Sequence, residues 1–262
     1  MTQRLQRQQG RHAVVTGAGS GIGRGIALRL AEEGARLSLM GRRVETLAET
    51  QAEARRRGSP AVQVFACDVR EPARIDAAFA ATQAEGPIHI LVANAGIGGP
   101  NVPGPGDRWD DLIATNLSGV YFCMRAAQRH LAPGPDVRHL VAVSSVLSRF
   151  GVPGYTGYCA AKTGVLGLVR ALALELAPGN VQVNAICPGW VESDMSRAGI
   201  ASIAKSTGQE YASALRMAVQ QVPLGRMNTP EEIAGAVAWL VSEDARGVIG
   251  QGIDMNGGSW MG

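Results

Sequence analysis

The chain has 262 residues, a formal net charge of +3, and a composition that is 46% hydrophobic and 18% charged. A chain of this size can bury a substantial core as one α/β domain, and its scattered arginines give no basic face of the kind that nucleic-acid-binding proteins use. No stretch of about 18 apolar residues occurs, and the basic N-terminus has no apolar signal segment. We therefore expect a cytoplasmic protein without a membrane span or a nucleic-acid partner.

The first eleven residues are polar and basic, so we expect residues 1–11 to be a flexible tail. Apolar runs then alternate with helical patterns through residues 12–262. This alternation is typical of one doubly wound α/β domain of the Rossmann type, with a seven-stranded, mostly parallel sheet and helices on both faces. The expected strands are 12–16, 35–40, 61–66, 88–93, 138–144, 181–186 and 249–254. In such sheets a ligand binds outside the carboxyl ends of the strands, where the strand order reverses.

A glycine-rich turn follows the first expected strand directly. The run His12–Thr16 leads into Gly17-Ala18-Gly19-Ser20-Gly21-Ile22-Gly23, and a helical pattern continues through Glu33. Glycine permits positive φ and a close approach of the backbone to a bound group, while the first helical turn offers free N–H groups and a positive dipole end. The spacing is Thr-Gly-x-x-x-Gly-x-Gly rather than Gly-x-Gly-x-x-Gly. It predicts a binding site for the pyrophosphate of a dinucleotide, with an ordinary strand-to-helix turn as the alternative.

The end of the second expected strand, Ser38-Leu39-Met40-Gly41-Arg42-Arg43, bears on the choice of dinucleotide. An NAD site commonly places a carboxylate here, whereas the 2′-phosphate of NADP requires a cation. No acidic residue occurs before Glu45, and Arg42 and Arg43 can bind phosphate by charge-assisted hydrogen bonds. The alternative is that both arginines are merely exposed, although the helix dipole disfavours cations at a helix start. We expect NADP(H), with NAD(H) as the second possibility.

Two further features have ordinary structural explanations. The four cysteines, Cys67, Cys123, Cys159 and Cys187, have no metal-ligand spacing, so we expect free and mostly buried thiols and no metal site. The run Arg55-Arg56-Arg57 precedes a glycine at the end of an expected helix, where cations favour the dipole. A solvated helix end accounts for that run.

A tyrosine and a lysine, Tyr158 and Lys162, lie one helical turn apart, and Ser145 lies thirteen residues upstream of the tyrosine. Residues four apart share a helix face. A phenol has a reference pKa of about 10, and a cation about 4 Å away lowers it by at most about three units at an effective dielectric of about 20. We expect Lys162 to bring the pKa of Tyr158 towards neutrality, which suits a general acid. For an isolated Tyr-x-x-x-Lys pair, an ordinary amphipathic helix is the alternative.

Taken together, these motifs resemble the short-chain dehydrogenase/reductase family from about His12 to the C-terminus, in the family's order. Two positions depart from the family pattern: Ala93 stands where many relatives have asparagine, and Ser193 replaces the usual threonine. The resemblance implies cofactor contacts from Gly17, Gly19, Ser20, Gly21, Ile22, Gly23, Arg42, Arg43, Asp68, Val69, Asn94, Ala95, Gly96, Tyr158, Lys162, Pro188, Gly189, Val191 and Ser193.

The resemblance also implies a catalytic set of Asn116, Ser145, Tyr158 and Lys162. In this family Ser145 would donate a hydrogen bond to the substrate carbonyl oxygen, and Tyr158 would supply the proton. Lys162 would lower the pKa of the phenol and hold the nicotinamide ribose, and Asn116 would anchor a water or the lysine in a proton relay. Hydride transfer between nicotinamide and the carbonyl carbon would then interconvert a ketone and a secondary alcohol. With NADPH, reduction is the expected direction.

The substrate is less well specified. Residues 195–223 are expected to form a mobile lid, and residues 98–106 and 146–155 to complete an apolar pocket, so we expect a small or cyclic carbonyl compound first. The chain also resembles 3-oxoacyl carrier-protein reductases and polyketide ketoreductases. However, the turn 177–180 lacks the basic residue that some carrier-protein-using relatives place there.

A non-catalytic NADP-sensing protein on the same fold is the alternative from another class. Such proteins usually lose the tyrosine or the lysine, and this chain retains both. By resemblance, a homotetramer is expected through the helices that contain Asn116 and Tyr158 and through residues 250–262.

Overall fold

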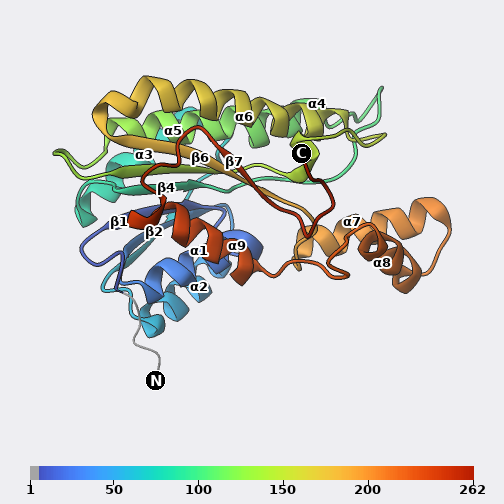
Figure 1. Cartoon of the computed structure of the whole chain (residues 1–262), viewed down its shortest axis with the longest axis horizontal. Coiled ribbons are helices and arrows are strands. Elements are labelled where there is room, and N and C mark those ends of the chain that lie inside the picture. The colour runs from blue at the N-terminus through green and yellow to red at the C-terminus, as the bar shows by residue number, and fades with distance from the viewer. Residues whose placement is uncertain (1–5) are drawn as a thin grey trace.

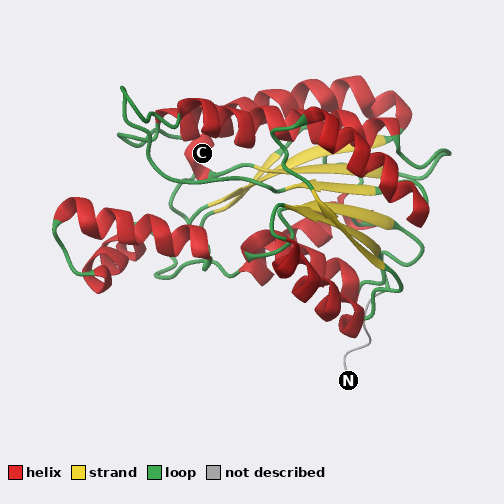
Figure 2. Cartoon of the chain, turned by 180° about the vertical axis from the view of Figure 1, so that it is seen from behind, coloured by secondary structure: helices red, strands yellow, loops and turns green. Residues whose placement is uncertain are grey.

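A computed structural model describes residues 6–262 as one seven-stranded sheet with strand order β3-β2-β1-β4-β5-β6-β7 (Figures 1 and 2). All neighbouring strands in it run parallel. The strands are β1 His12–Thr16, β2 Arg36–Gly41, β3 Val62–Ala66, β4 Ile90–Ala93, β5 Arg138–Val143, β6 Val181–Pro188 and β7 Gly252–Met255. The predicted seven-stranded, doubly wound α/β fold is confirmed.

Helices cover both faces of the sheet (Figure 1). One face carries α1 Gly21–Glu32, α2 Val44–Arg57 and α9 Pro230–Leu240, and the other carries α3 Pro72–Ala81, α4 Trp109–Ile113, α5 Gly119–Arg129 and α6 Thr156–Leu176. Alternate strand residues serve the two layers: Ala13 and Val15 belong to the core under α1 and α9, and Val14 belongs to the core under α3, α5 and α6. Because both faces are buried, the central strands β1 and β4 are mostly apolar, with sequences His-Ala-Val-Val-Thr and Ile-Leu-Val-Ala.

Two further helices, α7 (Asp194–Thr207) and α8 (Tyr211–Gln220), project from the sheet as a hairpin at the right of Figure 1. The hairpin has a small core of its own, formed by Ile200, Ala204, Ala214, Ala218 and Met227. Its two ends meet in a short parallel bridge between Val191 and Asn228, which we call the neck. The hairpin occupies the segment predicted as a lid, and its movement remains a prediction.

The strand order reverses between β1 and β4, which lie side by side in the middle of the sheet. The chain leaves β1 towards β2 and β3, whereas it leaves β4 towards β5 on the other side. The glycine turn follows β1, and Asn94 follows β4. A crevice is therefore expected between these two strand ends, as the doubly wound topology predicts.

The described part of the predicted tail, residues 6–11, is packed on the fold. Gln8 is fully buried, and its Nε2 donates to the carbonyl of Val241 at 3.2 Å. The Arg11 guanidinium donates to the carbonyls of Val137 at 2.7 Å and Val241 at 3.1 Å. The prediction of a flexible tail is wrong for this part, because its polar side chains bind carbonyls at the edge of the domain. The first five residues lie outside the described part.

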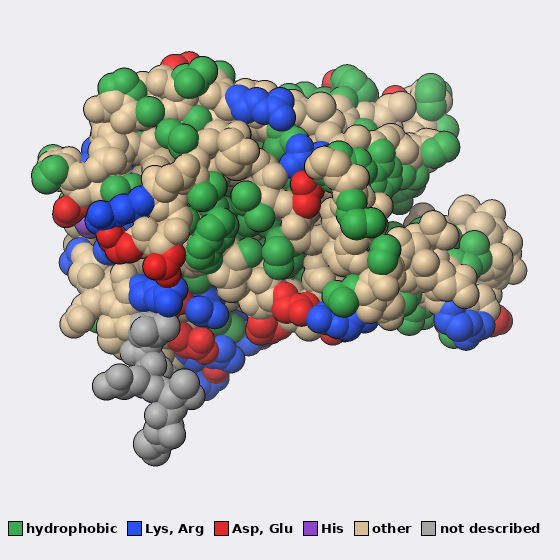
Figure 3. Space-filling view, in the orientation of Figure 1, with side chains coloured by type: hydrophobic (Ala, Val, Ile, Leu, Met, Phe, Trp, Pro, Cys, Tyr) green, Lys and Arg blue, Asp and Glu red, His purple; other side chains and the backbone are tan. Residues whose placement is uncertain are grey.

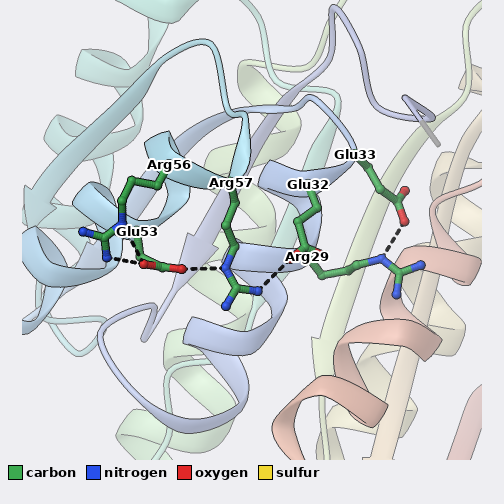
Figure 4. Close-up of polar contacts among 6 residues, drawn as sticks. All are labelled: Arg29, Glu32, Glu33, Glu53, Arg56 and Arg57. Carbon is green, nitrogen blue, oxygen red and sulfur yellow. Dashed lines mark hydrogen bonds and ion pairs between the residues drawn. The ribbon is translucent and has the colours of Figure 1, made fainter. Parts of the chain in front are cut away.

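The arginine run at the end of α2 forms ion pairs (Figure 4). Arg57 binds Glu53 of its own helix at 2.8 Å and Glu32 of α1 at 2.6 Å, and Arg56 also binds Glu53. The interpretation as a simple solvated helix end is therefore incomplete, because Arg57 ties α2 to α1. Each exposed pair contributes at most about 1 kcal/mol. In Figure 3, acidic and basic side chains lie beside one another on the face shown.

None of the helices within residues 6–262 combines the length and the apolarity that crossing a membrane requires.

Candidate active site

One cleft at the carboxyl ends of the central strands is lined by all the residues that the sequence analysis assigned to cofactor binding or catalysis. The roles of the individual residues remain predictions. The cleft also contains residues that the motifs did not single out: Gly41, Thr46, Leu47, Cys67, Ile97, Thr115, Val143, Ser144, Asp194, Met195 and Ser196. Widening each motif by one residue finds six of these, namely Gly41, Cys67, Ile97, Thr115, Ser144 and Asp194. Met195 and Ser196 begin the segment predicted as a lid, and Thr46, Leu47 and Val143 had no such signal.

The glycine turn is closed by contacts with β4. Gly17 has φ +65°, and a Cβ there would lie 2.8 Å from Nδ2 of Asn94. Gly23 packs against Gly17 and Asn94 with no space for a side chain. The amide of Asn94 donates to the carbonyl of Thr16 at 2.9 Å, and the Thr16 hydroxyl accepts from the N–H groups of Asn94 and Ala95 at 3.0 Å. Asn94 therefore fixes the turn in a shape that only glycine permits.

A phosphate-binding corner lies beside this turn. The N-cap residue of α1, Ser20, makes no side-chain cap, so the positive end of that helix is free for an anion. Arg42 and Arg43 are exposed at the rim, and Nη2 of Arg43 lies 3.3 Å from the Ser20 hydroxyl. The carboxylate of Asp68 is held by Arg70 at 2.8 Å, which lowers the pKa of Asp68 below its usual value. The corner thus offers two cations and a hydroxyl, and these residues fit a nucleotide phosphate.

The catalytic candidates converge where β5 ends and α6 begins. Ser145 is 7% exposed and Lys162 is 4% exposed. Tyr158 is half-buried, and all three residues line the cleft. The Lys162 ammonium donates to the carbonyl of Val143 at 2.9 Å and lies 5.7 Å from the centre of the Tyr158 ring. The Ser144 hydroxyl donates to the Lys162 carbonyl at 2.8 Å and thereby fixes α6 to the end of β5. A hydroxyl, a phenol and a buried cation thus share one wall.

The predicted direction of the phenol's pKa is wrong. Burial raises the pKa of Tyr158 above its usual value, and a hydrogen bond with Ser145 offsets only part of the rise. Burial also lowers the pKa of Lys162 to about 8. Desolvation dominates for both groups, and the ammonium bonds to the carbonyl of Val143 with the centre of the phenol ring 5.7 Å away. Tyr158 is therefore protonated at neutral pH, which is the form that a proton donor needs.

Asn116 lies in a π-helical turn, Ala114–Ser118, between α4 and α5, and its side chain is fully buried. Its Oδ1 accepts from the N–H of Ile97, and its Nδ2 donates to the carbonyl of Ile97, both at 2.9 Å. The expected side-chain contact with the lysine is thus replaced by one with the backbone that follows β4. A π turn interrupts the regular helical hydrogen-bond pattern, and the role of Asn116 in a proton relay stays a prediction.

The opposite wall follows β6 and leads into the hairpin. Ser193 is the N-cap of α7, and its hydroxyl accepts from the N–H of Ser196 at 3.3 Å. This capping role was not expected from the sequence. Beyond it, a Cβ at Gly98 would lie 3.0 Å from the sulfur of Met195. The hairpin therefore contacts the predicted substrate loop across the cleft.

Within residues 6–262, no group of three or more His, Cys, Asp or Glu side chains is placed to hold a metal ion. The four cysteines are free, as predicted, and Cys67, Cys123 and Cys187 are buried whereas Cys159 is partly exposed.

Comparison with known proteins identifies the family. The family model described as Enoyl-(Acyl carrier protein) reductase matches residues 17–259. The chain belongs to the short-chain dehydrogenase/reductase family. Among its relatives in this family, the granaticin polyketide synthase putative ketoacyl reductase 1 of Streptomyces violaceoruber is 39% identical over 94% of this chain and 92% of the relative. The 3-oxoacyl-(acyl-carrier-protein) reductase FabG of Escherichia coli (strain K12) is 34% identical over 97% and 98%.

Solved structures of the same family are also similar to this chain. A variant of actinorhodin polyketide ketoreductase with NADPH is 34% identical, with a TM-score of 0.88 over 98% of this chain and 99% of that one. Levodione reductase is 31% identical, with a TM-score of 0.87 over 96% and 98%. As a short-chain dehydrogenase/reductase, the chain is an NAD(P)-dependent oxidoreductase that acts on CH–OH and C=O groups. The predicted enzyme class is confirmed, and the non-catalytic alternative is set aside.

Proposed function

We propose that this enzyme reduces the 3-oxo group of an acyl or polyketide substrate with NADPH. The proposal depends on one observation. Ser145, Tyr158 and buried Lys162 share one wall of the cleft, where β5 ends and α6 begins. These three side chains provide a hydrogen-bond donor, an acid and a fixed positive charge for a carbonyl oxygen that gains negative charge. The ketoacyl reductases among the relatives support the substrate class.

The mechanism follows from these three groups. When bound, the nicotinamide supplies the hydride that the carbonyl carbon accepts. The Tyr158 hydroxyl transfers its proton to the carbonyl oxygen, towards which the Ser145 hydroxyl donates a hydrogen bond. The positive charge of Lys162 stabilises the phenolate that is left behind. Burial raises the pKa of Tyr158, so the acid form that donates the proton is present at neutral pH.

A free cyclic ketone is the second candidate substrate. The turn at the end of α6, Ala177–Gly179, has no basic residue with which to bind a carrier protein. Levodione reductase, one of the related structures, is named as a reductase of levodione. The apolar Met195 beside Gly98 is compatible with either class.

Turnover of two substrate sets tests the function. We expect NADPH consumption with 3-oxoacyl thioesters of coenzyme A or pantetheine to have a kcat/KM at least about tenfold higher than with cyclic ketones of equal carbon number, a difference of about 1.4 kcal/mol in transition-state binding. The opposite order favours the free cyclic ketone. Absence of turnover with every ketone, in enzyme that binds NADPH, contradicts the proposed function.

The preference for NADPH is attributed to Arg42 and Arg43. We expect the double variant R42D/R43S to lose about 10- to 100-fold in kcat/KM for NADPH, because each charge-assisted hydrogen bond contributes about 1.5–3 kcal/mol, while kcat/KM for NADH is kept or rises. A competition titration with both cofactors measures the change. The matched control R74D alters an exposed arginine of α3 outside the cleft. An unchanged NADPH preference would remove the phosphate-binding role.

We further propose a homotetramer that works in the cytoplasm. Large apolar side chains are exposed on α5, α6 and α9, namely Tyr121, Leu174 and Trp239, and Figure 3 shows hydrophobic atoms gathered near α9. Such faces are typical of subunit contacts. The free thiols suit a reducing compartment.

A further inference from the structure

The N-terminus of α6 is capped by a residue from a distant loop. Tyr155, at the N-cap position, makes no side-chain cap. Instead, Oδ1 of Asn101, from the loop between β4 and α4, accepts from the N–H of Gly157 at 2.8 Å and from the Thr156 hydroxyl at 3.1 Å. Asn101 thus satisfies an N–H that the first turn of a helix leaves free, across 56 residues of sequence. The next residue in α6 is Tyr158.

Asn101 is buried although its loop is exposed. Its exposed fraction is 5%, against 69% for the neighbouring Val102. Its Nδ2 donates to Oδ1 of Asp107 at 3.1 Å, and the same oxygen accepts from the N–H of Trp109 at 3.0 Å. Its own N–H donates to the carbonyl of Gly154 at 2.8 Å. One side chain therefore joins the substrate-side loop, the start of α4 and the start of α6, at the end of the molecule where α4 lies in Figure 1.

The first turn of α6 has little freedom while these contacts hold. A Cβ at Gly157 would lie 3.1 Å from Leu112, 3.3 Å from Oδ1 of Asn101 and 3.4 Å from Trp109, so the helix start is packed directly against α4 and the loop. A shift of this turn moves the Tyr158 hydroxyl with it. Displacements of about 1 Å can cost about 100-fold in rate, because proton transfer requires close alignment.

We propose that Asn101 is a positioning residue: it holds the first turn of α6 so that the Tyr158 hydroxyl stays aligned with Ser145, and it couples the substrate-side loop to that alignment. Asn101 acts through Gly157 and does not touch the reacting atoms. The expected effect of Asn101 on the rate rests on the proposed function, in which Tyr158 is the proton donor. The expected effect of Asn101 on the order of the first turn of α6 does not depend on the proposed function.

The test combines kinetics with hydrogen exchange on the full-length enzyme. In N101A we expect kcat for ketone reduction to fall about 10- to 100-fold, with the Kd for NADPH unchanged within about twofold, since no cofactor-lining residue is altered. Amide exchange, followed by mass spectrometry, is expected to be at least about tenfold faster in peptides covering residues 155–162 and unchanged in α9. The control D110N changes an exposed residue in the first turn of α4 and is expected to match the wild type.

A second set of variants, which exchanges the amide and the carboxylate between positions 101 and 107, keeps the test valid if N101A folds poorly. In N101D the acceptor for Gly157 is kept, but two carboxylates face each other at positions 101 and 107, so kcat is expected to fall. In N101D/D107N one amide and one carboxylate are again present, so kcat and slow exchange at residues 155–162 are expected to recover to within about threefold of the wild type. A residue that only contributes stability would lower the melting temperature without this pattern in kcat.

Three results overturn the proposal: wild-type kcat and exchange in N101A, loss of kcat without faster exchange at residues 155–162, or no recovery in N101D/D107N. A wild-type enzyme that reduces no ketone contradicts the proposed function instead. In that case the exchange of residues 155–162 in N101A and N101D/D107N alone decides whether Asn101 holds the helix start.

Discussion

Replacing Tyr158 with phenylalanine is expected to lower kcat for carbonyl reduction by about 10²- to 10⁴-fold, the contribution of a positioned general acid. The variant loses only the hydroxyl that carries the transferred proton. The ring keeps its edge-on contact with Tyr155, at 6.5 Å between centres, and its position near the Lys162 ammonium. The melting temperature and the Kd for NADPH, measured by fluorescence titration, are therefore expected to stay at wild-type values.

Tyr155 provides the matched control, because it is a second partly buried tyrosine three residues earlier, in contact with the Tyr158 ring and outside the cleft lining. Y155F is expected to change kcat by less than about threefold. If Y158F keeps more than a tenth of the wild-type kcat, the proton comes from another group and the assignment of Tyr158 fails.

Replacing Lys162 with methionine is expected to lower kcat by about 10²- to 10³-fold, the usual cost of removing one preorganised electrostatic contact to a developing charge. Methionine fills the buried site but leaves the carbonyl of Val143 without its donor at 2.9 Å, which costs about 1–3 kcal/mol of stability. The chain has only one other lysine, the exposed Lys205. K205M is therefore a direct control and is expected to be unaffected.

The pH profile gives a second measurement on the same residue. Burial lowers the pKa of Lys162 to about 8, whereas burial raises the pKa of Tyr158. As the pH rises through about 8, Lys162 loses its charge while Tyr158 keeps its proton, so kcat/KM for reduction is expected to fall on the alkaline side with an apparent pKa near 8. This alkaline limb should be absent in K162M. A limb that persists in K162M belongs to another group, and the charge of Lys162 is then not required.

Much of the fold could be predicted because its signals are local. The apolar runs of β1 and β4 are uninterrupted because both faces of those strands are buried. The requirement for glycine at positions 17 and 23 follows from a turn that packs on Asn94. The apolar runs and the glycine spacing each lie within a short stretch of sequence, so a single sequence displays them, although the partner that requires the glycines, Asn94, follows the distant strand β4.

What could not be predicted depends on contacts between distant segments and on side-chain direction. The spacing of Tyr158 and Lys162 places them on one helix face, but it does not show that the ammonium binds Val143 or that burial dominates the pKa of the phenol. Residues 8–11 look like a tail by composition, yet their polar groups find carbonyl partners on the domain. The cap on α6 joins Asn101 to Gly157, 56 residues later in the sequence, and no local pattern predicts it.

The neck between Val191 and Asn228 has a consequence for the evolution of this enzyme. Both ends of the α7–α8 hairpin leave the domain at one point, and the hairpin packs around its own small core. We expect such a unit to be exchangeable: a graft from a relative, joined at these two positions, would replace the predicted lid and leave Ser145, Tyr158 and Lys162 in place. New substrate ranges can thus arise by shuffling one module, without re-inventing the chemistry beneath it.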